Sequence, residues 1–224
     1  MTKDKSAVET YKYFSTLDGN QYIASEFALS FINHLIGKFQ IKSVLELGLG
    51  IGSICYSIHD FCERNDIDMR YAGTESNTFC LGVLPVYLKG YFKSLQVYPN
   101  LNQIPNDSNF DLVIIDGREE NLFNVKRLTT KQGVIVIEGD RQPQLEIIRK
   151  TFPKAKYVRV ISLSKNPPYG PFSSSHWCGG VQLVFINPSF RQKLYYFYLK
   201  ISTVIKYKLR KLKNNKLAKR KYSF

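Results

Sequence analysis

The stretch with the clearest chemical pattern is Ser43–Ser53, which reads Ser-Val-Leu-Glu-Leu-Gly-Leu-Gly-Ile-Gly-Ser. A short apolar run leads into the acid Glu46, and alternating glycines follow. These glycines are Gly48, Gly50 and Gly52. The run has the length of a buried parallel strand, and the glycines indicate a sharp turn at its carboxyl end. Because glycines admit a ligand close to the backbone and a following helix offers free N–H groups, we expect a loop for a nucleotide-type cofactor.

The spacing of the glycines indicates which cofactor. The dinucleotide fingerprint G-x-G-x-x-G would need its third glycine at Ser53 or Cys55, depending on the register, and neither residue is glycine. The pattern present, Glu-x-Gly-x-Gly-x-Gly, resembles the first motif of class I S-adenosylmethionine-dependent methyltransferases. The resemblance implies that Glu46 helps orient the methionine amino group, and that the three glycines and Ser53 contact the cofactor.

Further acids stand where other strands are expected to end. Glu75 follows the second apolar run, a position from which an acid accepts hydrogen bonds from a ribose diol, so we expect it to bind the cofactor ribose. Asp116 ends the buried run Phe110–Ile115, and Asp140 follows Gly133–Ile137. In an open α/β sheet, ligands collect beyond the carboxyl ends of the strands, so these acids should share one site.

The resemblance is closest to the small-molecule O-methyltransferases of the catechol type. It implies that Asp116 lies near the methyl donor, and that an acid after the fourth strand and an Asp-Asn pair after the fifth hold a divalent cation. This chain has Glu138-Gly139-Asp140 at the second position. Asp116 and Asp140 with waters could hold Mg²⁺, but the departure favours metal-free transfer with Asp116, Asp140 or His176 as the general base.

The loop at 164–179 supplies candidate contacts to the acceptor. It is rich in Pro, Gly and Ser and carries His176 beside the only tryptophan, Trp177. A substrate lid in which Tyr169 and Trp177 contact the acceptor is one interpretation. The alternative is a structural loop with Trp177 packed on the core.

The same loop contains Asn166-Pro167-Pro168-Tyr169, which resembles the motif with which methyltransferases of exocyclic amino groups hold their target nitrogen. In those enzymes the motif directly follows the fourth strand. Here that position is Asp116-Gly117-Arg118. We therefore interpret the match as chance, because a short motif outside its structural context carries little information.

Apolar runs alternate with helical periodicities along most of the chain, which predicts an α/β fold with a doubly wound, mostly parallel sheet. Strands are expected near 44–46, 69–75, 94–98, 110–115, 133–137, 156–163 and 180–186. Helices are expected near 25–38, 52–64, 77–92, 144–152 and within 119–130. Prolines and glycines at 167–171 leave no room for a helix between the last two strands, so these should form an antiparallel hairpin. The prediction is a seven-stranded, Rossmann-like methyltransferase domain over 25–187, preceded by a loose arm at 1–24.

Composition limits the remaining possibilities. With 224 residues the chain is long enough for one full α/β core. The first fourteen residues lack the apolar core of a signal peptide, and no apolar stretch approaches the length of a membrane span. The cysteines, which show neither a C-x-x-C pair nor zinc-like spacing, are Cys55, Cys62, Cys80 and Cys178. We expect a cytoplasmic protein with reduced thiols.

The positive charge is concentrated in the tail at 188–224. Of the 32 Lys and Arg residues, 12 lie within 189–224, where there is no Asp or Glu, which leaves 20 against 18 acids in the rest. Apolar residues that a helix would gather on one face are Leu194, Tyr198, Ile201, Ile205, Leu209 and Leu212. This pattern favours an interfacial helix on an anionic membrane. Binding to an RNA backbone, or docking on the domain or a second subunit, are the alternatives.

Together these features predict S-adenosylmethionine-dependent O-methylation of a small or lipid-linked acceptor, by a protein that also associates with the inner face of the membrane. A nucleic-acid methyltransferase that uses the basic tail is the main alternative among enzymes. A non-catalytic module that binds the cofactor or serves as a scaffold is the alternative outside enzymes. The glycine spacing disfavours a nicotinamide oxidoreductase.

Overall fold

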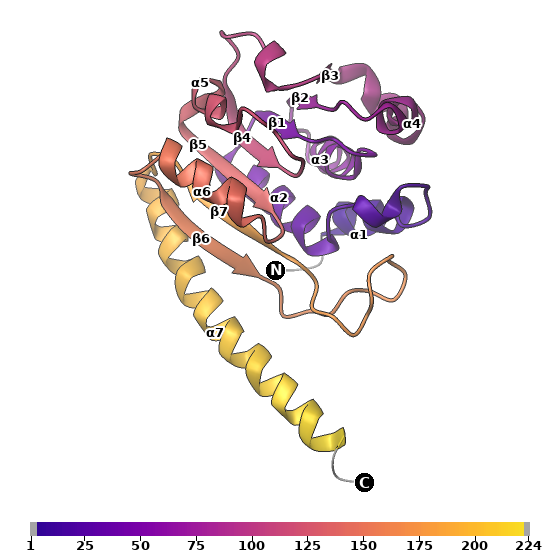
Figure 1. The fold of residues 1–224 in the computed structure, drawn as a ribbon, viewed down its shortest axis with the longest axis vertical. Helices are drawn as coiled ribbons and strands as arrows, with labels where there is room; N and C mark the ends of the chain where they lie inside the picture. Colours follow the sequence, from indigo (N-terminus) through magenta and orange to yellow (C-terminus); the bar gives the residue numbers. More distant parts are fainter. Residues whose placement is uncertain (1–3, 222–224) are drawn as a thin grey trace.

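The computed structural model describes the backbone of residues 4–221 and the side chains of residues 4–214. Seven strands form one sheet in the order β3-β2-β1-β4-β5-β7-β6 (Figure 1). The strands are β1 Ser43–Leu47, β2 Arg70–Thr74, β3 Leu95–Tyr98, β4 Phe110–Ile115, β5 Thr129–Glu138, β6 Lys156–Ile161 and β7 Gly180–Phe185. Only β7 runs antiparallel to its neighbours β5 and β6. The predicted doubly wound, mostly parallel sheet with a C-terminal antiparallel hairpin is confirmed.

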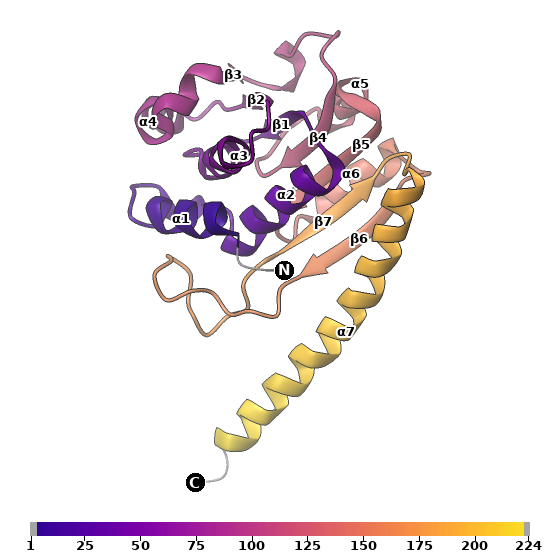
Figure 2. The same ribbon diagram turned by 180° about the vertical axis from the view of Figure 1, so that it is seen from behind.

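Helices cover both faces of the sheet, as Figure 2 shows from behind. The helices are α1 Lys5–Phe14, α2 Glu26–Phe39, α3 Ser53–Arg64, α4 Thr78–Leu88, α5 Val125–Leu128, α6 Gln142–Thr151 and α7 Phe190–Lys221. Short 3₁₀ turns are η1 Asn20–Tyr22, η2 Lys89–Ser94, η3 Leu101–Gln103 and η4 Leu122–Asn124. One apolar cluster lies between the sheet and the helices α1 to α4 with α7, and a second lies between the sheet and α5 and α6.

The strand β1 shows why the centre of the sheet folds as predicted. All five of its residues are buried, with Val44 in one apolar cluster and Leu45 and Leu47 in the other. A strand buried on both faces carries a continuous apolar run in its sequence, which makes it recognisable. The residue Glu46 is the exception within this run, and it is considered with the site below.

The N-terminal segment differs from the prediction. Residues 5–14 form the helix α1, which begins at the N-cap Asp4 and packs against α2 and α3. Ala7, Tyr11 and Phe14 are at most 1% exposed. The prediction of a loose arm over 1–24 is therefore wrong for this segment. The apolar positions of α1 recur at helical spacing, but the polar residues between them concealed the pattern.

Two predicted helices are shorter than expected. Over 119–130 the chain forms only the 3₁₀ turn η4 and the single turn α5, because β5 already begins at Thr129. The helix expected over 77–92 ends at Leu88, and η2 completes the connection to β3. The left-handed conformation of Lys89 stops the α-helix there. These differences leave the strand order unchanged.

The tail forms the long helix α7, which runs beside β6 and extends beyond the sheet (Figures 1 and 2). Tyr195, Leu199 and Thr203 are buried against the body, and the Thr203 hydroxyl donates a hydrogen bond of 2.7 Å to the carbonyl of Arg159. All six apolar residues that were predicted to share a face are exposed. None of the described helices combines the length and hydropathy needed to cross a bilayer.

Candidate functional site

The glycine loop joins β1 to α3 at the carboxyl edge of the sheet. Gly48, Gly50 and Gly52 all have positive φ angles, of 90°, 53° and 94°. Gly48 packs directly on the backbone of Gly117, since a Cβ on Gly48 would lie 2.5 Å from the Gly117 Cα atom. A Cβ on Gly50 would meet nothing within 4 Å. The loop is therefore tightly packed beneath Gly48 and open above Gly50, which leaves space for a ligand at the middle glycine.

The helix α3 begins directly after this loop. Its N-cap is Gly52, which has no side chain to accept a hydrogen bond from the first turn. Ser53 is buried at the first helical position, and its hydroxyl accepts a hydrogen bond of 3.4 Å from the backbone N–H of Ala24. The N–H groups of the first turn are available to a polar ligand beside the loop.

The carboxylate of Glu75 connects the glycine loop to the end of β2. One carboxylate oxygen accepts a hydrogen bond of 2.7 Å from the backbone N–H of Gly50. The other accepts hydrogen bonds from the backbone N–H groups of Ser76 and Asn77, at 2.9 and 2.8 Å. The side chain is half-buried, so its two oxygens retain acceptor positions. Glu75 thus lies beside the open glycine, where its carboxylate can accept hydrogen bonds from a diol.

Glu46 lies beneath the loop and is 1% exposed. Its carboxylate accepts a short hydrogen bond from the hydroxyl of Tyr71 on β2. Burial raises its pKa well above the ordinary range, the Tyr71 hydrogen bond opposes the rise, and the nearby Asp116 and Glu75 increase it. Glu46 is therefore close enough to Asp116 and Glu75 for their charges to interact, and the structure brings these three predicted site residues together.

A second group of charges lies where β4 and β5 end. Asp116 Oδ1 forms an ion pair with Arg141 Nη2 at 2.8 Å. Arg141 Nε also donates a hydrogen bond of 3.0 Å to the carbonyl oxygen of Glu138. Burial raises the pKa of Asp116, and Arg141 opposes this rise. Arg141 thus connects the two strand ends and neutralises a buried carboxylate.

These surroundings also shift the pKa of Glu138. Burial and the neighbouring Asp116 raise its pKa to about 7, while Arg141 and a hydrogen bond from the backbone of Ser25 lower it. A carboxyl group with a pKa near neutrality exchanges its proton easily at physiological pH. In the sequence, Glu138 stands out only as a neighbour of Asp140 at the end of β5. No sequence pattern indicates that Arg141 belongs to the site.

Asp140 and His176 lie in different surroundings from those the prediction gave them. The Asp140 side chain is 59% exposed and pairs with Arg159 at 3.1 Å. A hydrogen bond from Gln142 and the charge of Arg159 lower its pKa. His176 is exposed in the loop between β6 and β7, where its backbone hydrogen bonds with Ser173 and Asn166 fold the loop on itself. Neither side chain shows an interaction with Asp116.

The two predicted acceptor contacts are used within the protein. The Tyr169 hydroxyl donates to Glu26, and its ring contacts Tyr11 edge-on with 6.2 Å between ring centroids. The Trp177 ring lies beneath the cations of Lys165 and Arg210, at 4.1 and 4.9 Å from its centroid. These contacts favour a packing role for Trp177 that joins the loop to α7, which was the alternative left open.

The side-chain amide of Asn166 also forms a contact within the loop. It donates a hydrogen bond of 3.0 Å to the carbonyl of Ser173, and the side chain is buried. The amide nitrogen is thus used to hold the loop, which agrees with the interpretation that Asn166–Tyr169 is a chance match.

The donor set does not fit a divalent cation. Within the described residues there is no group of three His, Cys, Asp or Glu side chains arranged to hold a metal ion. The cationic partner of Asp116 is the guanidinium of Arg141, and Asp140 is paired with Arg159. Mg²⁺ requires oxygen ligands in a near-octahedral arrangement, which this set does not offer.

Comparisons with known proteins show which solved structures share this fold. No protein-family model matches the sequence, and no curated protein matches it. Among solved structures, the cofactor-bound protein Rv0187 from MTB is 18% identical with a TM-score of 0.60, over 83% of this chain and 91% of that one. A candidate O-methyltransferase from Klebsiella pneumoniae is 14% identical with a TM-score of 0.61, over 82% and 90% of the two chains.

The O-methyltransferase from Bacillus cereus in complex with SAH is 15% identical with a TM-score of 0.58, over 83% of this chain and 92% of that one. At these identities the likeness establishes the fold. The chain therefore has the Rossmann-like fold of class I S-adenosylmethionine-dependent methyltransferases, and the predicted resemblance is confirmed at the level of the fold.

Proposed function

We propose that this protein is an S-adenosylmethionine-dependent methyltransferase that acts on a hydroxyl group of a small or lipid-linked acceptor. The observation that carries the proposal is the open position above Gly50, with the Glu75 carboxylate bound to the Gly50 N–H in a methyltransferase-like fold. The SAH complex of the Bacillus cereus O-methyltransferase supports the choice of cofactor by analogy.

The residues present fit the cofactor. Gly50 would admit it close to the backbone, Glu75 would accept hydrogen bonds from its ribose, and Glu46 would lie beneath its methionine part. Gly48, Gly52 and Ser53 would hold the loop and the start of α3 in place. The bound cofactor supplies a methyl group carried on a positively charged sulfur.

We assign the proton transfer to Glu138. In its ionised form the carboxylate accepts a proton from the acceptor hydroxyl as the methyl group arrives, which is general-base work worth roughly 10²- to 10⁴-fold in rate. The paired Asp116 and Arg141 hold the strand ends in position beside it. This assignment replaces the three predicted bases with Glu138, because Asp116 is paired with Arg141, Asp140 is paired at the surface and His176 is exposed.

The cofactor is tested by calorimetric titration with S-adenosylmethionine and S-adenosylhomocysteine. The wild type is expected to bind both in the micromolar range, and Gly50→Arg to bind neither, because the arginine side chain fills the open position. Gly50→Ala is the matched control, since it carries the same backbone strain with little bulk, and it should bind within a few-fold of the wild type. Failure of the wild type to bind either ligand would refute the proposal and favour a scaffold.

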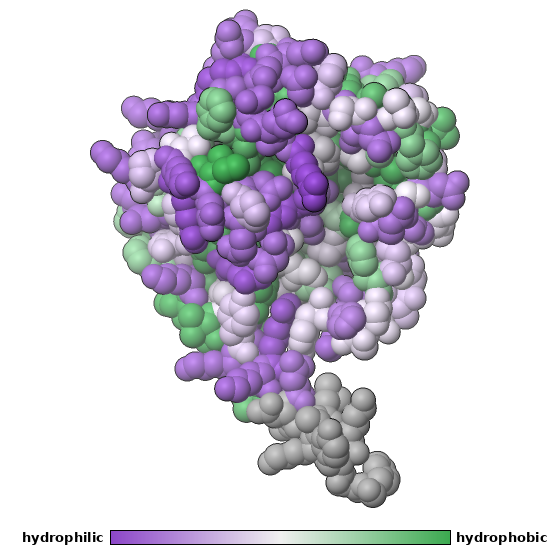
Figure 3. Space-filling view, viewed as in Figure 1, coloured by the Kyte–Doolittle hydropathy of each residue, from purple (hydrophilic) through white to green (hydrophobic). Residues whose placement is uncertain are grey.

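We also propose that α7 brings the protein to the anionic inner face of the cytoplasmic membrane. The exposed apolar side chains of α7 form a stripe that faces away from the sheet; they include Phe190, Phe197, Ile201, Val204, Ile205 and Leu212. Lysines lie beside this stripe, and Figure 3 shows apolar and hydrophilic residues adjoining along this part of the surface. An apolar stripe flanked by lysines is the arrangement of an interfacial helix.

Vesicle sedimentation tests this location. Vesicles with anionic lipid should retain the wild type better than neutral vesicles do, and Ile201→Asp should release it. The control is Thr203→Val, because it removes one buried hydrogen bond to Arg159 and leaves the exposed stripe unchanged. Deletion of the whole tail from Tyr195 onward would not be a suitable test of vesicle binding, because Tyr195 and Leu199 are buried against the body and their loss would disturb the fold. Equal retention by neutral and anionic vesicles would contradict the proposal, and salt-sensitive RNA binding without vesicle binding would favour the nucleic-acid alternative.

A further inference from the structure

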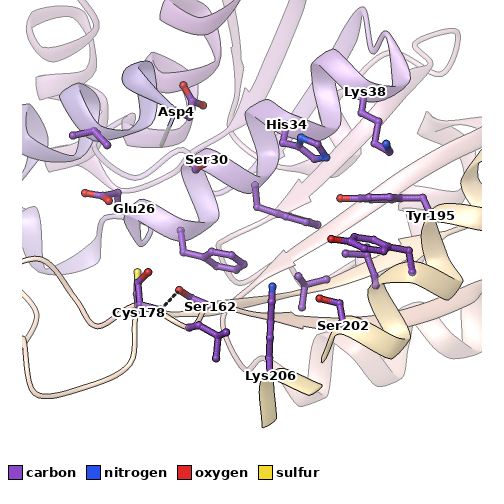
Figure 4. Close-up of a pocket in the computed structure, with 18 of the residues that line it drawn as sticks. Asp4, Glu26, Ser30, His34, Lys38, Ser162, Cys178, Tyr195, Ser202 and Lys206 are labelled. Atoms are coloured by element: carbon purple, nitrogen blue, oxygen red, sulfur yellow. Dashed lines mark hydrogen bonds between the residues drawn. The ribbon is translucent and has the colours of Figure 1, made fainter. Parts of the chain in front are cut away.

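A large cavity in the described part of the chain lies away from the glycine loop. It has a volume of about 880 Å³ and lies between α2 and α7, above β6 (Figure 4). We call it the α2–α7 groove. Its volume falls within the roughly 300–1,000 Å³ that is usual for small-molecule sites. The residues along its walls indicate which chemical class of ligand would fit it.

The groove is bounded by the helices α2 and α7, which run antiparallel. At one end Lys38 of α2 lies 4.6 Å from the ring centroid of Tyr195. At the other end Arg210 of α7 donates a hydrogen bond of 2.8 Å to the carbonyl of Ser162, which also lines the groove. The wall formed by α7 extends from Arg191 to Lys206, which is roughly 22 Å at the helical rise of 1.5 Å per residue.

The walls of the groove are mainly apolar and aromatic. From α2 come Phe27 and Phe31, whose rings stack with 5.9 Å between centroids. From α7 come Leu194 and the stacked rings of Tyr195 and Tyr198, with 6.0 Å between centroids. Such a surface gains free energy when an apolar chain displaces water from it.

The uncompensated charge in the groove is positive. Four cations line it, namely Lys38, Lys165, Arg191 and Lys206. Two acids also line it, Asp4 and Glu26, so the cations outnumber the acids by two. The groove therefore combines an apolar wall with a positive potential.

Lys206 is the cation best placed to bind a ligand. It rises from α7 with its ammonium group directed toward α2 (Figure 4). None of the ion pairs between described residues involves it. Partial burial and the neighbouring Arg210 lower its pKa. An anion in the groove would relieve both effects, because it would pair with a desolvated charge.

We propose that the α2–α7 groove binds a single-chain anionic amphiphile, with its hydrocarbon chain along the aromatic wall and its carboxylate or phosphate head at Lys206. The occupant must be elongated because the groove follows about four turns of α7. It must be anionic because the cations that line the groove outnumber the acids, and no ion pair between described residues involves Lys206. The binding site is separate from the glycine loop and does not depend on the proposed methyl transfer.

Fluorescence titration with cis-parinaric acid tests the proposal, since this fatty acid becomes fluorescent when its chain enters an apolar site. Its methyl ester is the matched ligand, with the same chain and no charge. The wild type should bind the acid at least about tenfold more tightly than the ester, because a hydrogen bond to a charged group contributes roughly 1.5–3 kcal/mol.

Two substitutions of α7 locate the site. Lys206→Gln should weaken binding of the acid by about tenfold or more and leave binding of the ester unchanged. Lys208→Gln is the control, because Lys208 is exposed on the same helix and does not line the groove. Thermal unfolding of both variants, followed by circular dichroism, would confirm that they remain folded.

Several results would overturn the proposal. Equal affinity for acid and ester, or equal loss in both lysine variants, would mean that no specific head-group contact exists. A dimer in sedimentation that competes with the fatty acid would mean that a second copy covers the groove. Since S-adenosylmethionine titration reports on a different site, failure of either experiment is distinguishable from failure of the other.

Discussion

The substitution Glu138→Gln tests the electrostatics of the candidate site without knowledge of the acceptor. It removes a partly buried carboxyl group and keeps the shape of the side chain. The pKa of Glu138 rises from its ordinary value of 4.5 to about 7, chiefly through burial. An acid with a raised pKa in the folded state binds its proton more tightly when the protein is folded. The wild type should therefore lose stability as the pH rises from 4.5 to about 7, and level off above that value.

The size of this effect follows from the two pKa values. A change of one pKa unit corresponds to about 1.4 kcal/mol, so the charged Glu138 costs the fold on the order of 3 kcal/mol above neutral pH. The Gln variant does not carry this cost. The difference in the free energy of unfolding between variant and wild type should thus grow by up to this amount, in favour of the variant, between about pH 4.5 and pH 8.

Urea unfolding followed by circular dichroism measures this difference at a series of pH values and constant ionic strength. Asp140→Asn is the control, because Asp140 lies only two residues from Glu138, and its lowered pKa places its titration below pH 4.5. Its difference from the wild type should stay constant over the range. If the Glu138→Gln difference is also constant, or changes in the opposite direction, Glu138 does not hold its proton as inferred, and its role as general base loses its support.

Other predictions concern the packing around the site, each measured by urea unfolding. Gly48→Ala should destabilise the fold by roughly 2 kcal/mol or more, since its Cβ would clash with the Gly117 backbone, whereas Gly50→Ala should cost only about 1 kcal/mol; equal losses would contradict the packing described. Arg141→Leu should cost roughly 1–3 kcal/mol near neutral pH by leaving the Asp116 carboxylate unpaired, and less in acid; an unchanged stability would show that the pair is unimportant. Phe14→Ala should cost about 3–5 kcal/mol if α1 belongs to the core, and near zero if it is a loose arm.

The central features of the fold were predictable because they rest on local sequence patterns. β1 and β4 are buried on both faces, so each is a continuous apolar run that ends at a turn. The antiparallel pairing of β6 and β7 followed from the prolines at 167–171, which exclude a crossover helix. Glycines with positive φ likewise mark the glycine loop, because other residues rarely adopt that conformation.

The helix α1 shows where local patterns were insufficient. Its sequence is polar at most positions, and only packing against α2 and α3 makes Tyr11 and Phe14 core residues. The six apolar residues predicted to share one face of α7 are all exposed, but the position of this helix beside β6 was not predictable. A helix of this amphipathic kind carries no information in its sequence about which surface it will cover.

The sequence by itself determined the glycine loop, the alternation of strands and helices, and the acids that end the strands. These depend on backbone conformation and on the apolar pattern of single elements. Only the tertiary structure decided which charges meet: Arg141 pairs with Asp116 at the ends of two neighbouring strands, Glu138 is partly buried beside them, and Asp140, on the same connection as Arg141, is left at the surface. It also decided that α2 and α7 lie side by side and enclose a groove. Ionisation and cavities depend on distances between elements that are remote in the sequence, and those distances exist only once the chain has folded.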